Sequence, residues 1–392
     1  MNAFIAILFA SLLSRLGYQM ARSPVLPAFA ADLGALPELI GIVVAASTIT
    51  GVFFKLPAGA LSDVLGRKRM MVLGALFFAL PPFLYPFVHD AWSLLALRFV
   101  HGFATAIFSP VASAYVAGLA ERGRGARLGW FSSANDIGAT AGPLVGGFVL
   151  YFTASYSVTY LTVGALGVLT FIVVLLLPDV ERTTAPEAKT FAARATEFRQ
   201  GVAEVFKTPP IFVAAGIEAV MYLGYGAFLG FLPIYAKKIG LNEAEIAIVL
   251  GAQLAVAMAA KPITGRVSDR VGRIPVIVIG LLLCVTALPL IFRSESLTAF
   301  VLAAPLLGLG VGAVTPVTNA LIADLASARR LGAAMGVFGT IWDIGEAAGP
   351  MIAGFLIGGL GYAATFDVLA AITAAVTLGL IALVRDPKRA RP

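Results

Sequence analysis

The stretch "GALSDVLGR" occupies residues 59–67, and "GRVSDRVGR" repeats its pattern at residues 265–273. Five residues of the first copy return 206 positions later, and they are Gly59, Ser62, Asp63, Gly66 and Arg67. Self-similarity at a fixed offset indicates that a chain is built from repeated structural units. We therefore expect two related halves, each with the same order of elements.

A second pair of segments supports the repeat. "NDIGATAGPLVGGF" at residues 135–148 returns as "WDIGEAAGPMIAGF" at residues 342–355, with an offset of 207. The two copies share an aspartate and a glycine–proline pair. They differ where Asn135 becomes Trp342, where Glu346 is added and where Gly146 becomes Ala353. We expect any directional chemistry to depend on these asymmetric positions.

The composition places the chain in a membrane. Of 392 residues, 59% are hydrophobic and 12% are charged, whereas a soluble domain carries about 25% charged residues. A helix needs roughly 20 mainly apolar residues to cross a bilayer. We predict twelve such spans, at residues 3–30, 39–60, 70–88, 92–117, 128–151, 157–178, 208–235, 243–262, 275–293, 297–322, 332–357 and 362–384.

The predicted fold is an all-α integral membrane protein with two pseudo-symmetric six-helix bundles, at residues 1–178 and 208–392. Because each half has an even number of spans, the two halves share one topology, and substrate sites in such proteins lie near the membrane midplane. Residues 179–207 form a polar linker, for which we predict an amphipathic helix on the cytoplasmic surface; a disordered tether is the alternative.

The positions of Lys and Arg set the orientation. With both termini in the cytoplasm, Lys237, Lys238 and Arg293 fall outside, Arg15, Arg22 and Arg98 fall within spans, and the remaining basic residues are cytoplasmic. This predicts a multi-pass protein of the cell inner membrane. It also accounts for the net charge of +7 without nucleic acid.

"GALSDVLGRKR" resembles the loop signature G-x-L-x-D-x-x-G-R-K/R of the major facilitator superfamily. The resemblance implies that Gly59, Asp63, Gly66 and Arg67 lie on the cytoplasmic side and help to hold an outward-facing state. It assigns the same role more weakly to Asp269 and Arg273 in the second copy. A purely topogenic role of these charges is the alternative.

Two further segments resemble the twelve-helix drug:proton antiporters of that superfamily. In "LLALRFVHG" (94–102), the resemblance gives Arg98 a place in proton coupling, and "GATAGPLVGG" (138–147) is similar to the motif of the fifth helix. Gly138, Gly142 and Gly146 form a stripe of small residues that lets another helix approach closely. Pro143 removes a backbone hydrogen bond and favours a kink.

Seven charged residues lie well inside the predicted spans, namely Arg15, Arg22, Arg98, Asp136, Glu218, Asp343 and Glu346. Each costs about 2.5–3.5 kcal/mol at a helix centre, so they cannot all face lipid. The acids among them, Asp136, Glu218, Asp343 and Glu346, are candidates for taking up and releasing protons. The alternative is a set of buried ion pairs that fixes helix packing.

Two helix faces predict the substrate site. Arg15, Tyr18 and Arg22 share one face of the first helix, and Glu218, Tyr222 and Tyr225 share one face of the seventh. Our substrate-binding candidates are Arg15, Tyr18, Arg22, Tyr222 and Tyr225 from these faces, together with Asn135 and Trp342; ordinary core packing of the tyrosines is the alternative. Two arginines suit an anionic or zwitterionic substrate better than a lipophilic cation.

No P-loop, nucleophilic triad or metal-ligand spacing occurs. We expect no enzyme activity, cofactor or metal. The predicted function is proton-coupled efflux of a small amphiphilic compound or drug by alternating access, with substrate, protons and lipid as the partners of a monomer. The alternatives are an importer or facilitator of an anionic metabolite, and a non-transporting receptor or scaffold.

Overall fold

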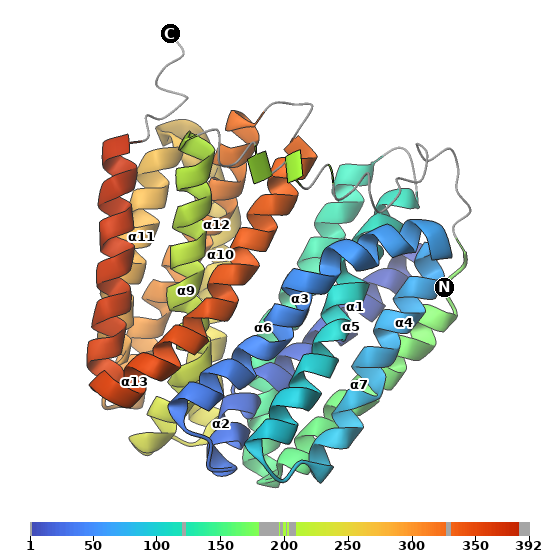
Figure 1. The fold of residues 1–392 in the computed structure, drawn as a ribbon, viewed down its shortest axis with the longest axis horizontal. Coiled ribbons are helices and arrows are strands. Elements are labelled where there is room, and N and C mark those ends of the chain that lie inside the picture. The colour runs from blue at the N-terminus through green and yellow to red at the C-terminus, as the bar shows by residue number, and fades with distance from the viewer. Residues whose placement is uncertain are drawn as a thin grey trace. The chain divides into compact units, whose positions relative to one another are not determined.

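The structure is a computed structural model, and it describes residues 2–119, 123–179, 196, 199–200, 202–203, 209–326 and 331–383. Within these ranges the regular structure is helical and no β-strand occurs. The chain divides into two compact units (Figure 1). Unit 1 comprises Met1–Ala35 and Ala46–Arg194, and unit 2 comprises Leu36–Ala45 and Ala195–Pro392.

The helices of the first half are α1 (Ala3–Arg22), α2 (Val25–Asp32), α3 (Pro37–Leu65), α4 (Arg67–Ala79), the 3₁₀ helix η1 (Pro81–Phe87), α5 (Ala91–Gly118), α6 (Arg124–Thr153) and α7 (Tyr156–Leu175). Those of the second half are α9 (Pro209–Lys238), α10 (Glu243–Val271), α11 (Arg273–Ile291), α12 (Leu297–Leu325) and α13 (Leu331–Leu383). Polar N-caps begin several of them. Asp90 caps α5 and Ser296 caps α12, and Asn242 and Glu245 form a capping box on α10.

Ten helices in the described part of the chain are long and apolar enough to cross a membrane. Each of the twelve predicted spans overlaps a helix, but α6 is not among the ten, and the last two predicted spans fall in the single candidate Ala334–Ile381. The backbone of α13 leaves helical geometry at Gly361, which has a φ of 76°. An all-helical membrane fold is therefore confirmed, and the count of twelve stays a prediction.

Most of the linker at 179–207 lies outside the described residues. Of the few described positions in it, 179 is not helical, and 196, 199–200 and 202–203 are helical. The predicted amphipathic helix on the membrane surface therefore stays a prediction, as does the placement of both termini.

Within unit 1, α6 packs closely on α1 through its glycine stripe. A Cβ atom added at Gly138 would lie 2.6 Å from the carbonyl oxygen of Leu12, and one at Gly142 would lie 2.9 Å from that of Leu16. The contacts are with backbone atoms, which cannot move aside as a flexible side chain can. The stripe is thus a surface along which two helix backbones approach each other.

Unit 2 repeats this contact between α13 and α9, which Figure 1 shows side by side. Gly345 meets the carbonyl oxygen of Ala219, and Gly349 meets that of Leu223. Glycines and carbonyls alike are displaced by 207 residues from their counterparts in unit 1. The repeat seen in the sequence is therefore also a repeat of helix contacts.

The beginning of α3 groups with unit 2, whereas the sequence-based boundary placed all of residues 1–178 in one bundle. The reason lies in close backbone contacts of Leu36–Ala45. Gly41 meets the backbone of Pro350, and Gly354 meets the backbone of Pro37. Both contacts require glycine because a side chain would fill the space occupied by the facing backbone.

Candidate functional site

In unit 2, an acidic side chain lies buried in the apolar helix α9. Glu218 is completely buried, and within the described residues neither of its carboxyl oxygens has a hydrogen-bond partner. The side chains of Thr315 and Thr318 on α12 lie close to it. A charged carboxylate without a cation or hydrogen bonds is costly in such surroundings, so the neutral, protonated form is favoured.

An aromatic cluster lies one turn along α9 from this acid. The ring of Tyr222 stacks on that of Trp342 from α13, with centroids 4.8 Å apart, and meets the ring of Tyr225 edge-on at 5.8 Å. Tyr222 also contacts the Thr315 hydroxyl at 3.4 Å. The indole nitrogen of Trp342 is buried and has no hydrogen-bond partner among the described residues. The cluster thus combines flat aromatic surface with a free donor, next to the acid.

The Tyr225 hydroxyl donates to Oε1 of Gln253 on α10 at 3.5 Å. Gln253 is completely buried, and its amide nitrogen has no partner in the described part of the chain. We name Glu218, Tyr222, Tyr225, Gln253 and Trp342 the α9 cluster. It offers hydrogen-bond donors, acceptors and aromatic faces within one unit.

In unit 1, the corresponding cluster is built around a cation. Arg98 on α5 is completely buried, and its guanidinium carbon lies 4.9 Å from the centre of the Tyr18 ring. His101, also completely buried, meets the Tyr18 ring edge-on at 5.3 Å. The Tyr85 hydroxyl is 3.1 Å from Nδ1 of His101. The Tyr85 ring stacks on Tyr160 at 3.8 Å.

The other predicted site residues are less enclosed. Arg15, Asn135 and Asp136 are half-buried, as is Glu346, which lies close enough to Tyr222 to interact electrostatically with it. Asp343 and Arg22 are buried, and Arg22 reaches the Thr48 hydroxyl at 3.5 Å. The Asn135 amide donates back to the carbonyl of Phe131. Within each unit, the structure therefore brings together some of the predicted residues, and their roles stay predictions.

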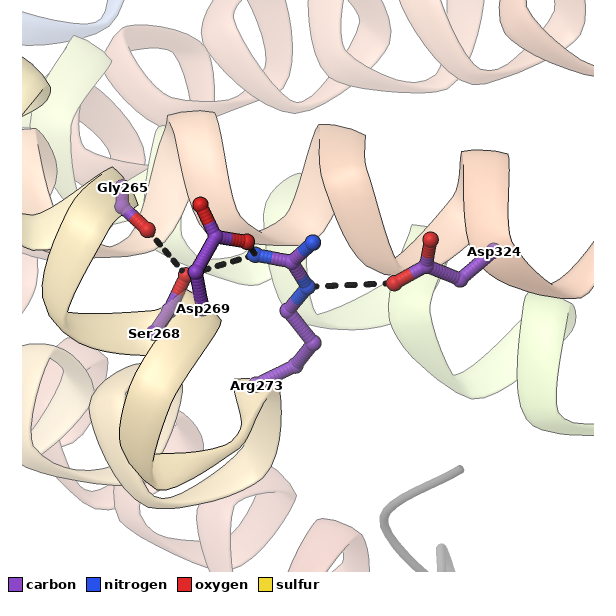
Figure 2. Close-up of polar contacts among 5 residues, drawn as sticks. All are labelled: Gly265, Ser268, Asp269, Arg273 and Asp324. Carbon is purple, nitrogen blue, oxygen red and sulfur yellow. Dashed lines mark hydrogen bonds and ion pairs between the residues drawn. The ribbon is translucent and has the colours of Figure 1, made fainter. Parts of the chain in front are cut away.

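The repeated loop motif forms a polar network at the junction of α10 and α11, shown in Figure 2. Nη1 of Arg273 lies 2.8 Å from a carboxylate oxygen of Asp269, and it donates to the Ser268 hydroxyl at 2.8 Å. Nε of Arg273 donates to Asp324 at 3.1 Å. The Ser268 hydroxyl donates to the carbonyl of Gly265. A mostly buried guanidinium is thereby held by two acids from two helices.

The first copy differs from the second. Ser62 again donates to the carbonyl of Gly59, at 2.7 Å, but Arg67 donates to the backbone carbonyl of Ala114 at 3.0 Å. Position 118, which corresponds to Asp324 in the repeat, is a glycine. The side chain of Asp63 lies outside what the structure describes. The second ion-pair partner of the motif arginine, Asp324 on α12, is therefore a feature of the second copy.

Both motif copies depend on a glycine conformation that other residues rarely adopt. Gly66 has a φ of 96° and Gly272 a φ of 102°, and each ends one helix and begins the next. Positive φ carries no steric penalty for glycine because it lacks a Cβ atom. The arginine that follows, Arg67 or Arg273, is placed at the first turn of the new helix by this bend.

Sequence reasoning missed Gln253, His101 and Tyr85 as parts of the clusters. Gln253 is an isolated amide in an apolar span, which was a usable signal. His101 is a single histidine in an apolar span, and Tyr85 lies in η1, a short 3₁₀ helix that no periodicity predicts.

Comparisons with known proteins agree with this architecture. Residues 7–235 and 214–392 match the family model described as Major Facilitator Superfamily. An uncharacterized MFS-type transporter of Methanocaldococcus jannaschii is 25% identical over 365 residues, which cover 93% of each chain. The quinolone resistance protein NorA of Staphylococcus aureus is 26% identical over 338 residues, which cover 85% of this chain and 84% of NorA.

Among solved structures, that of the nucleoside transporter NupG is similar with a TM-score of 0.80. The match covers 97% of this chain and 99% of NupG, at 15% sequence identity. At this level of identity, the likeness concerns the fold alone.

Proposed function

The chain belongs to the major facilitator superfamily and is therefore a multi-pass membrane transporter, and we propose that it exports small amphiphilic compounds in exchange for protons. The proposal includes alternating access, location in the inner membrane and both termini in the cytoplasm. The observation that carries it is the isolated acid Glu218.

Glu218 has the properties of a proton carrier. Its carboxyl group is buried without a cation or a hydrogen-bond partner among the described residues, so protonation removes the charge that is costly there. Deprotonation requires water or a cation to reach it. A carboxyl group whose two protonation states need different surroundings can couple proton movement to a change of conformation.

The neighbouring aromatic rings support an amphiphilic substrate. Tyr222 and Trp342 offer flat apolar faces, and the Trp342 nitrogen and the Gln253 amide offer unused donors. Aromatic side chains with one polar atom bind ligands that are apolar on one side and polar on the other. A membrane transporter confers resistance by lowering the internal concentration of a compound, so the similarity to a quinolone resistance protein favours export.

The test uses the full chain in proteoliposomes with an imposed pH gradient. The probes are norfloxacin, a quinolone, and ethidium, a lipophilic cation, and a trapped pH-sensitive dye reports proton movement. We expect the pH gradient to drive flux of at least one probe, with protons moving the opposite way. Glu218→Gln should abolish the pH-driven flux, and the control Glu295→Gln, which changes an exposed acid, should retain it.

Two outcomes would overturn parts of the proposal. Flux that is indifferent to the pH gradient for both probes and for a broad panel of amphiphiles would exclude proton coupling. Wild-type flux in Glu218→Gln would move the proton site elsewhere, with Asp136 and the Asp343–Glu346 pair as the next acids to replace. Gradient-driven movement of probe and protons in the same direction would instead support an importer.

A further inference from the structure

The guanidinium of Arg98 has no counter-charge among the described residues. None of its three nitrogens has a hydrogen-bond partner, and no acid there lies within ion-pair distance. An arginine side chain has five N–H donors and stays charged at any physiological pH. Removing one partner of a buried ion pair costs about 3–5 kcal/mol, because it leaves the other charge buried without a partner. Such a group therefore needs an acceptor.

The groups around Arg98 do not supply that acceptor. The Tyr18 ring faces the guanidinium carbon at 4.9 Å, which is a cation–π contact. This contact lowers the cost by about 2 kcal/mol when desolvated, but it leaves the N–H groups at the edge of the guanidinium unbonded. The Tyr85 hydroxyl lies close to the guanidinium as well as 3.1 Å from Nδ1 of His101. A single neutral hydroxyl group can neither satisfy the five N–H donors of an arginine nor balance its charge.

Further unused polar atoms lie around the same tyrosine. The Ser47 hydroxyl and Nε2 of His101 are buried and have no hydrogen-bond partner in the described part of the chain. The Tyr18 hydroxyl lies close to Ser47, and Arg22 is near enough to Tyr18 to interact with it electrostatically. The charged groups that face these side chains are thus two arginines, and no described carboxylate is among them.

We propose that Tyr18, Ser47, Arg98 and His101, named here the arginine cluster, bind a monovalent anion. The anion completes the hydrogen bonds of the guanidinium and balances its charge. Two sources share this chemistry, a halide ion from solution and the carboxylate group of an organic substrate. The site lies wholly within unit 1 and is independent of Glu218, so it does not depend on the direction or the coupling of transport.

This assignment also changes the expected role of Arg98. A guanidinium that cannot release its proton is not itself a proton carrier. In the arginine cluster it acts as the anchor of a bound anion, and the Tyr18 ring fixes its position from one face.

The test measures binding to the full chain in nanodiscs without any gradient. Sodium chloride or sodium benzoate replaces sodium methanesulfonate at constant ionic strength, and the midpoint of thermal unfolding is followed. A ligand that binds only the folded state raises this midpoint in a saturable way. We expect such a rise with chloride, with benzoate or with both. Arg98→Gln should weaken the binding at least tenfold, whereas the control Arg293→Gln, at an exposed arginine, should leave it unchanged.

The two salts distinguish the sources. A response to chloride identifies a halide site, and a response to benzoate alone identifies a site for an organic carboxylate. Tyr18→Phe keeps the ring over the guanidinium but removes the hydroxyl, so it should fold and bind several-fold more weakly even if Arg98→Gln does not fold. If neither salt shifts the wild-type midpoint in a saturable way, or if Arg98→Gln responds as the wild type does, the proposal is wrong.

Discussion

Replacing Gly66 by alanine tests the link between the repeated motif and the backbone at its bend. Gly66 has a φ of 96° and a ψ of 140°, and a Cβ atom added there would meet nothing within 4 Å. Alanine would therefore fit the available space. The substitution changes only how favourable this backbone conformation is for the residue that adopts it.

The expected cost follows from that conformation. A non-glycine residue held in a sparsely populated region of φ and ψ costs about 1–3 kcal/mol. Gly265→Ala is the matched control from the other copy of the motif, because Gly265 lies inside α10 and its Cβ would also meet nothing within 4 Å. Alanine in a helix interior is favoured over glycine by about 0.5–1 kcal/mol. The two substitutions should therefore change the free energy of unfolding in opposite directions.

The measurement is the midpoint of thermal unfolding of the full chain in nanodiscs, followed by circular dichroism of the helices. We expect Gly66→Ala to melt below the wild type and Gly265→Ala to melt at or above it. Gly66→Asn should also melt below the wild type, because the ψ of 140° lies outside the left-handed region that asparagine tolerates. If Gly66→Ala were as stable as the wild type, the bend would not depend on glycine and the reasoning would fail.

Three further experiments test other parts of the fold by the same measurement. Gly142→Ala would place a Cβ atom 2.9 Å from a backbone oxygen of α1, and overpacking of this kind should lower stability by about 1–3 kcal/mol. Asp90 caps α5, and its hydrogen bonds with Ser93 lower the pKa of the carboxyl group below its usual value. Because the pKa of Asp90 is depressed in the folded state, the stability that Asp90 contributes is present at neutral pH and is lost as the pH falls through that pKa. Asp90→Ala should therefore melt below the wild type at pH 7. The difference between the two melting midpoints should become smaller at acidic pH. A double-mutant cycle of Arg273→Gln and Asp324→Asn should give a coupling of about 1 kcal/mol, and additive effects would contradict the ion pair of Figure 2.

The sequence predicted the membrane class and the repeat because both leave periodic signals. Gly138 and Gly142 share a helix face by their spacing alone, so a close helix contact could be expected, and the structure places that contact on α1. The identity of the partner helix carries no such local signal. It depends on which helices pack together after all of them have formed.

The candidate site could be predicted in part for the same reason. Tyr222 and Glu218 are one turn apart on one helix, and this follows from sequence spacing. The stacking of Tyr222 on Trp342 and the contact of Tyr225 with Gln253 join residues that are far apart in the chain. No pattern within a single helix predicts such contacts, because they are determined by helix rotation and tilt.

The repeat also makes the two isolated charges informative. By the offsets that match the motifs, Arg98 corresponds to Ala304 and Glu218 corresponds to Ser11, and all four positions are buried. Each half therefore tolerates a small side chain where the other half carries a charge. Helix packing alone does not require either charge, since the counterpart helix packs without one. The symmetric glycine contacts account for the fold, and the cation of unit 1 and the acid of unit 2 are the residues to which functional differences between the halves can be assigned.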